Sequence, residues 1–103
     1  MLPVYKILRE QEWIEFQTQG SFHGSESDLK DGFIHLSTNN QVKRIINKYF
    51  STERTIYVVK FIRTEFLNKL LWEPASNGDL YPHLYSVPLY FNEMDSFKVI
   101  TGK

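Results

Sequence analysis

The chain has 103 residues, with 12 Lys and Arg against 12 Asp and Glu, no cysteine and 16% aromatic residues. This length predicts one domain over residues 1–103, and the absence of cysteine excludes disulfides and thiolate zinc sites. A net charge of zero argues against a general nucleic-acid binder and against a polybasic membrane anchor. No run is apolar enough to span a membrane and the start lacks a signal-peptide pattern, so we expect a cytoplasmic protein.

The first third of the chain is predicted to form a strand, a helix and a polar loop. Residues 4–8 are short and apolar, which indicates a strand. Residues 9–19 lack Gly and Pro and indicate a helix that ends at Gly20. The polar segment 20–32 is expected to be an ordered loop with one helical turn at residues 27–30.

The next segment, residues 32–37, has the alternation of a strand. Side chains two residues apart share a face, which places Phe33, His35 and Ser37 on one face and Ile34 and Leu36 on the other.

A helix capped by Thr38 or Asn39 is the best-defined element of the sequence. Apolar residues recur along it at helical spacing, at Val42, Ile45, Ile46, Tyr49 and Phe50. The other side carries polar and basic residues, which we interpret as a solvated face: Lys43, Arg44, Asn47 and Lys48.

The middle of the chain is predicted to form a buried strand followed by short elements. Residues 55–62 are β-branched and aromatic, which indicates a central strand covered on both faces. Residues 64–70 are expected to form a short helix or turn capped by Thr64, and residues 70–73 a short strand stopped by Pro74.

The last part of the chain is predicted to be a series of strands. Asn77 and Gly78 form a strong turn signal, and three strands are expected after it, over residues 81–85, 87–91 and 97–101. Strands therefore outnumber helices, and we predict an α+β fold: one small domain with a mixed, mostly antiparallel sheet and two main helices.

Three histidines are the candidates for acid–base chemistry near neutral pH. His35 is either a strand histidine bonded to a neighbour or a ligand contact, because Ser37 shares its face and Thr38 opens a helix that could hold an anion or a ribose hydroxyl. His23 lies in the polar loop and is expected to be exposed. Because no histidine spacing supports a zinc site, we assign no metal ligand.

The second candidate segment is residues 81–85, which surround His83 with two tyrosines and a proline. This segment either packs as a loop or presents an aromatic ring such as Tyr85 to a flat ligand. Upstream, Glu73 follows Trp72 at a strand end, where it is either a solvated terminus or an acid or base in a partly apolar setting.

These motifs resemble those of a small, mostly bacterial family known as domain of unknown function 952. Residues 31–38 with Gln41 resemble its DGFIHxS…Q signature, and residues 81–85 resemble its aromatic-Pro-His-aliphatic-Tyr signature. Three further residues stand at family-like positions: Trp13, Gly20 and Glu73. The resemblance extends over nearly the whole chain.

The resemblance implies a fold similar to that of ADP-ribosyltransferases and RNA 2′-phosphotransferases, a split mixed β-structure around a cleft that binds NAD. By that likeness His35 and its following hydroxyls lie in the cleft, and His83, Tyr85 and Glu73 line it from the other sheet. Lys6 stands in the first strand where those transferases often carry His or Arg, which makes it a candidate ligand contact.

Our leading hypothesis is a cleft for a nucleotide-like ligand, with NAD as the candidate cofactor and glycosyl or ADP-ribosyl transfer as the candidate reaction. His35 and His83 would be acid–base groups, and Glu73 would stabilise positive charge at an anomeric carbon. The expected ligand contacts are Ser37, Thr38, Tyr85, Trp72 and Lys6.

Two alternatives remain open. One is a binding module without catalysis, and the other is a two-histidine phosphoester hydrolase or cyclase. The two-histidine hydrolase or cyclase and the leading hypothesis both require His35 and His83 to face one pocket. The identity of the ligand and the oligomeric state are not specified by the sequence.

Overall fold

A four-stranded antiparallel sheet runs through the molecule in the order β4-β1-β5-β9. The computed structural model describes residues 2–102. The strands of this sheet are β4 (Ser37–Thr38), β1 (Val4–Arg9), β5 (Thr55–Phe61) and β9 (Ser96–Thr101). The predicted central strand is confirmed, since β5 lies between β1 and β9 and buries Ile56, Val59 and Phe61 completely.

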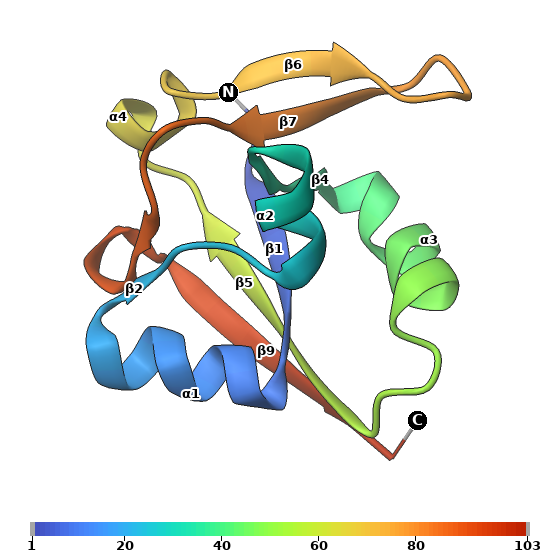
Figure 1. Cartoon of the computed structure of the whole chain (residues 1–103), viewed down its shortest axis with the longest axis vertical. Helices are drawn as coiled ribbons and strands as arrows, with labels where there is room; N and C mark the ends of the chain where they lie inside the picture. Colours follow the sequence, from blue (N-terminus) through green and yellow to red (C-terminus); the bar gives the residue numbers. More distant parts are fainter. Residues whose placement is uncertain (1, 103) are drawn as a thin grey trace.

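A second, three-stranded antiparallel sheet has the order β3-β7-β6. Its strands are β3 (Ile34–His35), β7 (Leu80–Leu84) and β6 (Leu71–Pro74). In Figure 1 the β6–β7 hairpin crosses the top of the molecule, above the N-terminal part of the first sheet. A third ladder joins β2 (Ser21–Phe22) to β8 (Leu89–Tyr90).

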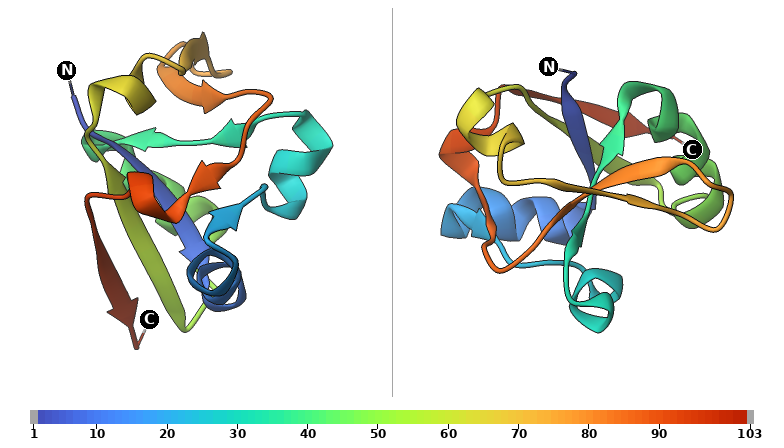
Figure 2. Two further views of the ribbon diagram at one scale, coloured as in Figure 1. Left: turned by 90° about the vertical axis from the view of Figure 1, so that its left-hand side faces the viewer. Right: turned by 90° about the horizontal axis from the view of Figure 1, so that it is seen from above.

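Two main helices lie on either side of β1, as Figures 1 and 2 show. The helices of the chain are α1 (Glu10–Gln19), α2 (Glu26–Asp31), α3 (Asn39–Tyr49) and α4 (Thr64–Leu67), followed by a 3₁₀ turn at Phe91–Glu93. Alternate residues of β1 face α1 and α3: Leu8 shares a core cluster with Trp13 of α1, whereas Ile7 shares one with Ile46 of α3. The sheet is therefore covered on both faces.

The predicted helices are confirmed with small changes at their ends. Gly20 ends α1 in the left-handed conformation, with φ of 77°, as the sequence indicated. Thr38 is the N-cap of α3. The short helix α4 is preceded by Arg63 rather than capped by Thr64, and Pro74 is the last residue of β6 rather than its stop. Pro74 is tolerated there because β6 is an edge strand.

The helical turn expected at residues 27–30 is confirmed within α2, but two other predictions on segment 20–38 are wrong. The expected loop holds strand β2 and the six-residue helix α2, because Ser25 and Asp28 cap the helix start and Gly32 ends it in the left-handed conformation. The expected continuous strand 32–37 is divided at Leu36, where the chain passes from the second sheet to the first. The expected strand 87–91 is also shorter, since only β8 pairs there.

The predicted class is confirmed at the level of an α+β domain with mostly antiparallel sheets and two main helices. Within residues 2–102, no helix is both long and apolar enough to cross a membrane.

Candidate functional site

The antiparallel register of β3 and β7 places His35 directly opposite His83. Residues opposite each other in a ladder point to the same face of the sheet, and the two imidazole centroids are 5.6 Å apart. Phe33 stacks on His83 at 4.0 Å and lies 4.6 Å from the ring of His35. The structure therefore brings together the two histidines that the sequence singled out, although they come from distant parts of the chain.

His35 is held by carboxylates at both ring nitrogens. Its Nδ1 lies 2.6 Å from Oδ1 of Asp28, and its Nε2 lies 3.0 Å from Oδ2 of Asp31. Only the contact with Asp28 is a hydrogen bond, and because an ionised carboxylate only accepts, Nδ1 carries the proton of that bond. The Asp31 carboxylate lies beside Nε2, where it forms an ion pair when the ring is protonated.

Asp28 is the centre of this cluster and is only 2% exposed. It accepts hydrogen bonds from Lys6 Nζ at 2.8 Å and from the backbone N–H groups of Ser25 and His35 at 2.9 and 3.1 Å. Burial alone would raise the pKa of the Asp28 carboxyl, but hydrogen bonding from His35 and the charge of Lys6 outweigh burial and lower that pKa far below its usual range. Asp28 is therefore a buried anion at neutral pH, and it orients His35.

Lys6 is also buried, and its ammonium group bridges the two sheets. It donates to Asp28 and, at 2.9 Å, to the carbonyl oxygen of His35. An ammonium group has three N–H donors, so one donor has no partner among residues 2–102.

Gly24 lets the chain pass close to this cluster. Its φ is +130°, and a Cβ placed on it would lie 3.0 Å from Cβ of Asp28. Any other residue would be strained there and would displace the carboxylate that holds His35.

His83 is held by a single carboxylate, on the opposite side from His35. Its Nδ1 lies 2.7 Å from Oε1 of Glu73, and the hydroxyl of Tyr85 donates to the same oxygen at 2.6 Å. The Tyr85 hydroxyl and the His83 ring lower the pKa of the Glu73 carboxyl, and this carboxylate raises the pKa of the Tyr85 phenol. With Nδ1 donating to Glu73, the Nε2 of a neutral His83 carries a lone pair.

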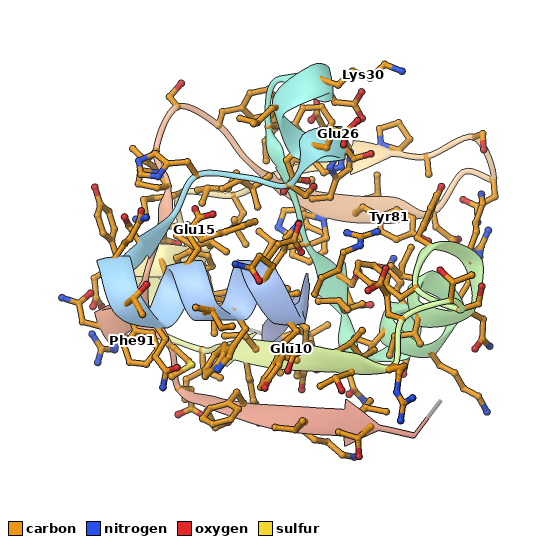
Figure 3. The ribbon with its side chains drawn as sticks, turned by 60° about the horizontal axis from the view of Figure 1, so that its bottom comes forward. Glu10, Glu15, Glu26, Lys30, Tyr81 and Phe91 are labelled. Carbon is orange, nitrogen blue, oxygen red and sulfur yellow. The ribbon has the colours of Figure 1, made fainter. Side chains whose placement is uncertain are left out.

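Both histidines line a cavity of about 380 Å³, which is within the usual range for small-molecule sites. Its wall comes from β1, β3, β4, β7, α2, α3 and the β6–β7 turn. Figure 3 shows Tyr81 on β7, on the side of the molecule where α3 lies, and its side chain belongs to the cavity wall. The wall is rich in cations, with Lys6, Arg9, Arg44 and Lys48 against the carboxylate of Asp28.

The structure distributes the predicted ligand contacts unevenly. Ser37 and Lys6 are in the cavity wall, and both are buried. Among the described residues, the wall does not include Thr38, whose backbone N–H donates to Oε1 of Gln41 at the start of α3. It also omits Tyr85, whose hydroxyl holds Glu73 instead.

Trp72 and Glu73 lie on opposite faces of β6, because adjacent residues of a strand point in opposite directions. Trp72 pairs with Pro82 and is therefore turned away from the face that carries His83. Glu73 supports His83 from outside the cavity wall.

Several cavity residues were not predicted from the sequence. Asp28 could have been found, because Ser25 and Asp28 have the spacing of a capping box, which indicates a helix start in the polar loop. Arg44 and Lys48 belong to the helix face interpreted as solvated, and this interpretation is confirmed because both are exposed, but the sequence did not indicate that they also border the cavity. Within the described part of the chain, no three His, Cys, Asp or Glu side chains are grouped so that they could hold a metal ion.

Residues 7–96 match the family described as Protein of unknown function (DUF952). The crystal structure of protein CC0527 from Caulobacter crescentus is similar to this chain with a TM-score of 0.86 and 35% sequence identity, covering 94% of this chain and 84% of that one. The solution NMR structure of CC0527 has a TM-score of 0.78 at 35% identity and covers 95% of this chain and 84% of that one. Among curated proteins, none matches the chain.

Proposed function

The chain belongs to the DUF952 family of proteins of unknown function, and we propose that it binds a nucleotide-like ligand by a phosphate group and cleaves a phosphoester by acid–base chemistry. The observation that carries this proposal is the unequal environment of two histidines that face one cavity. His35 has a carboxylate at each ring nitrogen, whereas His83 has one.

This inequality assigns the roles. Paired acid and base residues usually have surroundings that favour opposite protonation states. His35, protonated between Asp28 and Asp31, is the general acid, and Asp31 is exposed enough to release Nε2 to a ligand. His83, with Nδ1 donating to Glu73, is the general base through Nε2.

The cations of the wall suit a phosphate. Lys6 has a donor to spare beside His35, and ammonium groups bind phosphate oxygens by charge-assisted hydrogen bonds. The balanced charge of the whole chain agrees with a small ligand, because the positive charge is local to the cavity.

For a cyclic phosphodiester the step balances with water as co-reactant. Nε2 of His83 takes a proton from water, and the water oxygen forms a bond to phosphorus. The bond from phosphorus to one ester oxygen breaks, and His35 gives its proton to that oxygen, which leaves as a hydroxyl. The product is a phosphate monoester, and the starting state is restored when His83 releases its proton to solvent and His35 takes one up from solvent.

Glycosyl transfer on NAD, which the likeness to ADP-ribosyltransferases suggests, asks Glu73 to face an anomeric carbon. The contacts of Glu73 support a different role, because its Oε1 accepts from both His83 and Tyr85 outside the cavity wall. NAD is therefore a competing ligand in the test of the proposal.

The test follows adenosine 2′,3′-cyclic monophosphate by ³¹P NMR in the presence of the full chain. We expect a monoester signal to replace the cyclic one, and we expect His35→Gln and His83→Gln each to lower the rate by about a hundredfold or more. His23→Gln is the matched control, because His23 is exposed and outside the cavity wall, and it should keep the rate.

Other outcomes identify the rivals. Shifts of the His35 and His83 ring signals without turnover would indicate a binding module without catalysis. Release of nicotinamide from NAD would indicate glycosyl transfer instead of phosphoester cleavage. If neither histidine responds to the cyclic nucleotide at millimolar concentration, the proposal fails.

A further inference from the structure

We infer that the cavity contains a second anion subsite at its α3 end, formed by Arg44 and Lys48, and that its ligand is a nucleotide with two separate phosphate groups. The inference rests on the proposed function for the phosphate at the histidines, and it adds a separate contact for the second phosphate.

Arg44 and Lys48 present their side chains together. They are four residues apart on α3, so they lie on one face of the helix, and both line the cavity. Lys43, one position before Arg44, has the same charge as Lys48 but does not line the cavity among the described residues. Two of the three cations of this helix segment therefore border the cavity.

These two cations are poorly compensated within the protein. The ion pair of Arg44 with Asp79 is long, at 3.4 Å, and both side chains are more than half exposed, which makes the pair weak. Lys48 has no carboxylate partner within residues 2–102. The α3 end of the cavity therefore carries a surplus of positive charge that an anion would neutralise.

The other charges of the cavity are already matched. Lys6 pairs with Asp28, and His35 faces Asp28 and Asp31. The guanidinium group of Arg9 lies 3.2 Å from Glu53 and covers the ring of Phe50 at 4.4 Å. Arg9 therefore belongs to the wall, and among the cavity cations described by the structure Arg44 and Lys48 have the weakest compensation.

The histidines and the two cations are placed at different ends of one segment of the chain. His83 and Tyr81 share one face of β7, and Asp79, the ion-pair partner of Arg44, lies in the β6–β7 turn two residues before Tyr81. A phosphate held by Arg44 and Lys48 is therefore a different group from the phosphate at the histidines.

Tyr81 lies between the histidine end and the α3 end of the cavity. Its ring is half-buried in the cavity wall, where it offers a stacking surface to a base or a sugar. The Nε2 of Gln41 on α3 donates to the carbonyl oxygen of Leu80 at 2.8 Å, which fixes the helix against β7. The two subsites are thus held at a set distance before any ligand binds.

The experiment measures the affinity of the full chain for adenosine 3′,5′-bisphosphate and for adenosine 5′-monophosphate by calorimetry, with the His35 and His83 ring signals followed by NMR. We expect the bisphosphate to bind at least about tenfold more tightly than the monophosphate, because charge-assisted contacts to the second phosphate add to the first. In the double variant Arg44→Gln, Lys48→Gln this ratio should fall to about twofold or less. Lys43→Gln, the matched control on the same helix, should keep the ratio of the unmodified chain.

The result separates this inference from the proposed function. Equal affinities for the two nucleotides, with shifted histidine signals, would overturn the second subsite and leave the first in place. A bisphosphate preference that depends on Arg44 and Lys48 but leaves the histidine signals unmoved would support the second subsite and overturn the proposed function. A ratio that survives the double variant would assign the second phosphate to other residues and overturn the inference.

Discussion

The two histidine–carboxylate pairs of the cavity are alike in geometry and differ in burial. The carboxylate of His35, Asp28, is 2% exposed and bonded to the buried ammonium of Lys6, whereas that of His83, Glu73, has a side chain that is 34% exposed. Removing one partner of a buried ion pair leaves an uncompensated charge in the interior, while an exposed pair contributes little to stability. The Asp28–His35 pair is therefore part of the folded core. The Glu73–His83 pair orients the imidazole of His83 and has little effect on folding.

The largest expected effect is on stability, from Asp28→Asn. The substitution keeps the shape but leaves Lys6 buried beside a neutral amide, so we expect the free energy of unfolding to fall by about 3–5 kcal/mol. Urea unfolding followed by tryptophan fluorescence measures this loss. The control is Asp31→Asn, which removes the exposed partner of the same histidine and should change the free energy of unfolding by less than about 1 kcal/mol. Equal losses of unfolding free energy in the two variants would contradict the claim that Asp28 belongs to the core and Asp31 to the surface.

The pH dependence of stability should show the same contrast. The pKa of Asp28 is lowered in the folded state, so its carboxylate contributes a stabilisation that is fully present above the ordinary Asp value of about 3.9 and is lost as the pH falls through the range below it. We expect this acid loss to be on the order of 2 kcal/mol and to be absent in Asp28→Asn. Unfolding free energies measured between neutral and strongly acidic pH test the prediction, and an unchanged acid loss in the variant would contradict it.

Glu73→Gln should separate activity from stability. The amide no longer fixes which nitrogen of His83 carries the proton, so we expect phosphoester cleavage to slow by about tenfold or more. The free energy of unfolding should change by less than about 1 kcal/mol, because Glu73 is partly exposed. Rates and unfolding curves of the same preparations give both values. A destabilisation as large as that of Asp28→Asn would show that the two pairs are equivalent.

The smallest expected effect is on the ionisation of Tyr85. Its hydroxyl donates to Glu73, and the negative charge of that carboxylate raises the pKa of the phenol above its usual value. In Glu73→Gln this pKa should fall back toward its usual value, as ¹³C NMR of labelled tyrosine rings would show. Tyr5, which lies in β1 on the other sheet, provides an internal reference in the same spectrum.

Much of the fold is predictable from local patterns, because the determining contacts are short in sequence. The apolar stripe of α3, the left-handed Gly20 after α1 and the Asn77–Gly78 turn are each read from a few neighbouring residues. The division of residues 32–37 at Leu36 is not local, since it depends on β7 pairing with one half and β1 with the other. A single sequence contains no record of such pairing.

The site was predictable in its histidines and less so in its carboxylates and cations. His35 and His83 stand out because few side chains titrate near neutrality. Asp28 lies in a polar segment, where its capping-box spacing indicates a helix start, but its burial depends on an ion pair with Lys6, which is distant in the sequence. Trp72 shows the opposite failure, because its place beside Glu73 in the sequence becomes the opposite face of β6 in the structure.

The corner at Leu36 has a mechanical consequence. His35 and His83 are carried by one small sheet, so any hinge motion between the two sheets would turn at Leu36 and move both rings as one rigid body. The spacing of acid and base would survive such a motion, while the distance from the histidines to β1 of the first sheet would change. Lys6 would restrain such a motion, because it belongs to β1 of the first sheet and donates a hydrogen bond to the carbonyl oxygen of His35 in the second. One buried lysine thus couples the charge of the core to the width of the cavity.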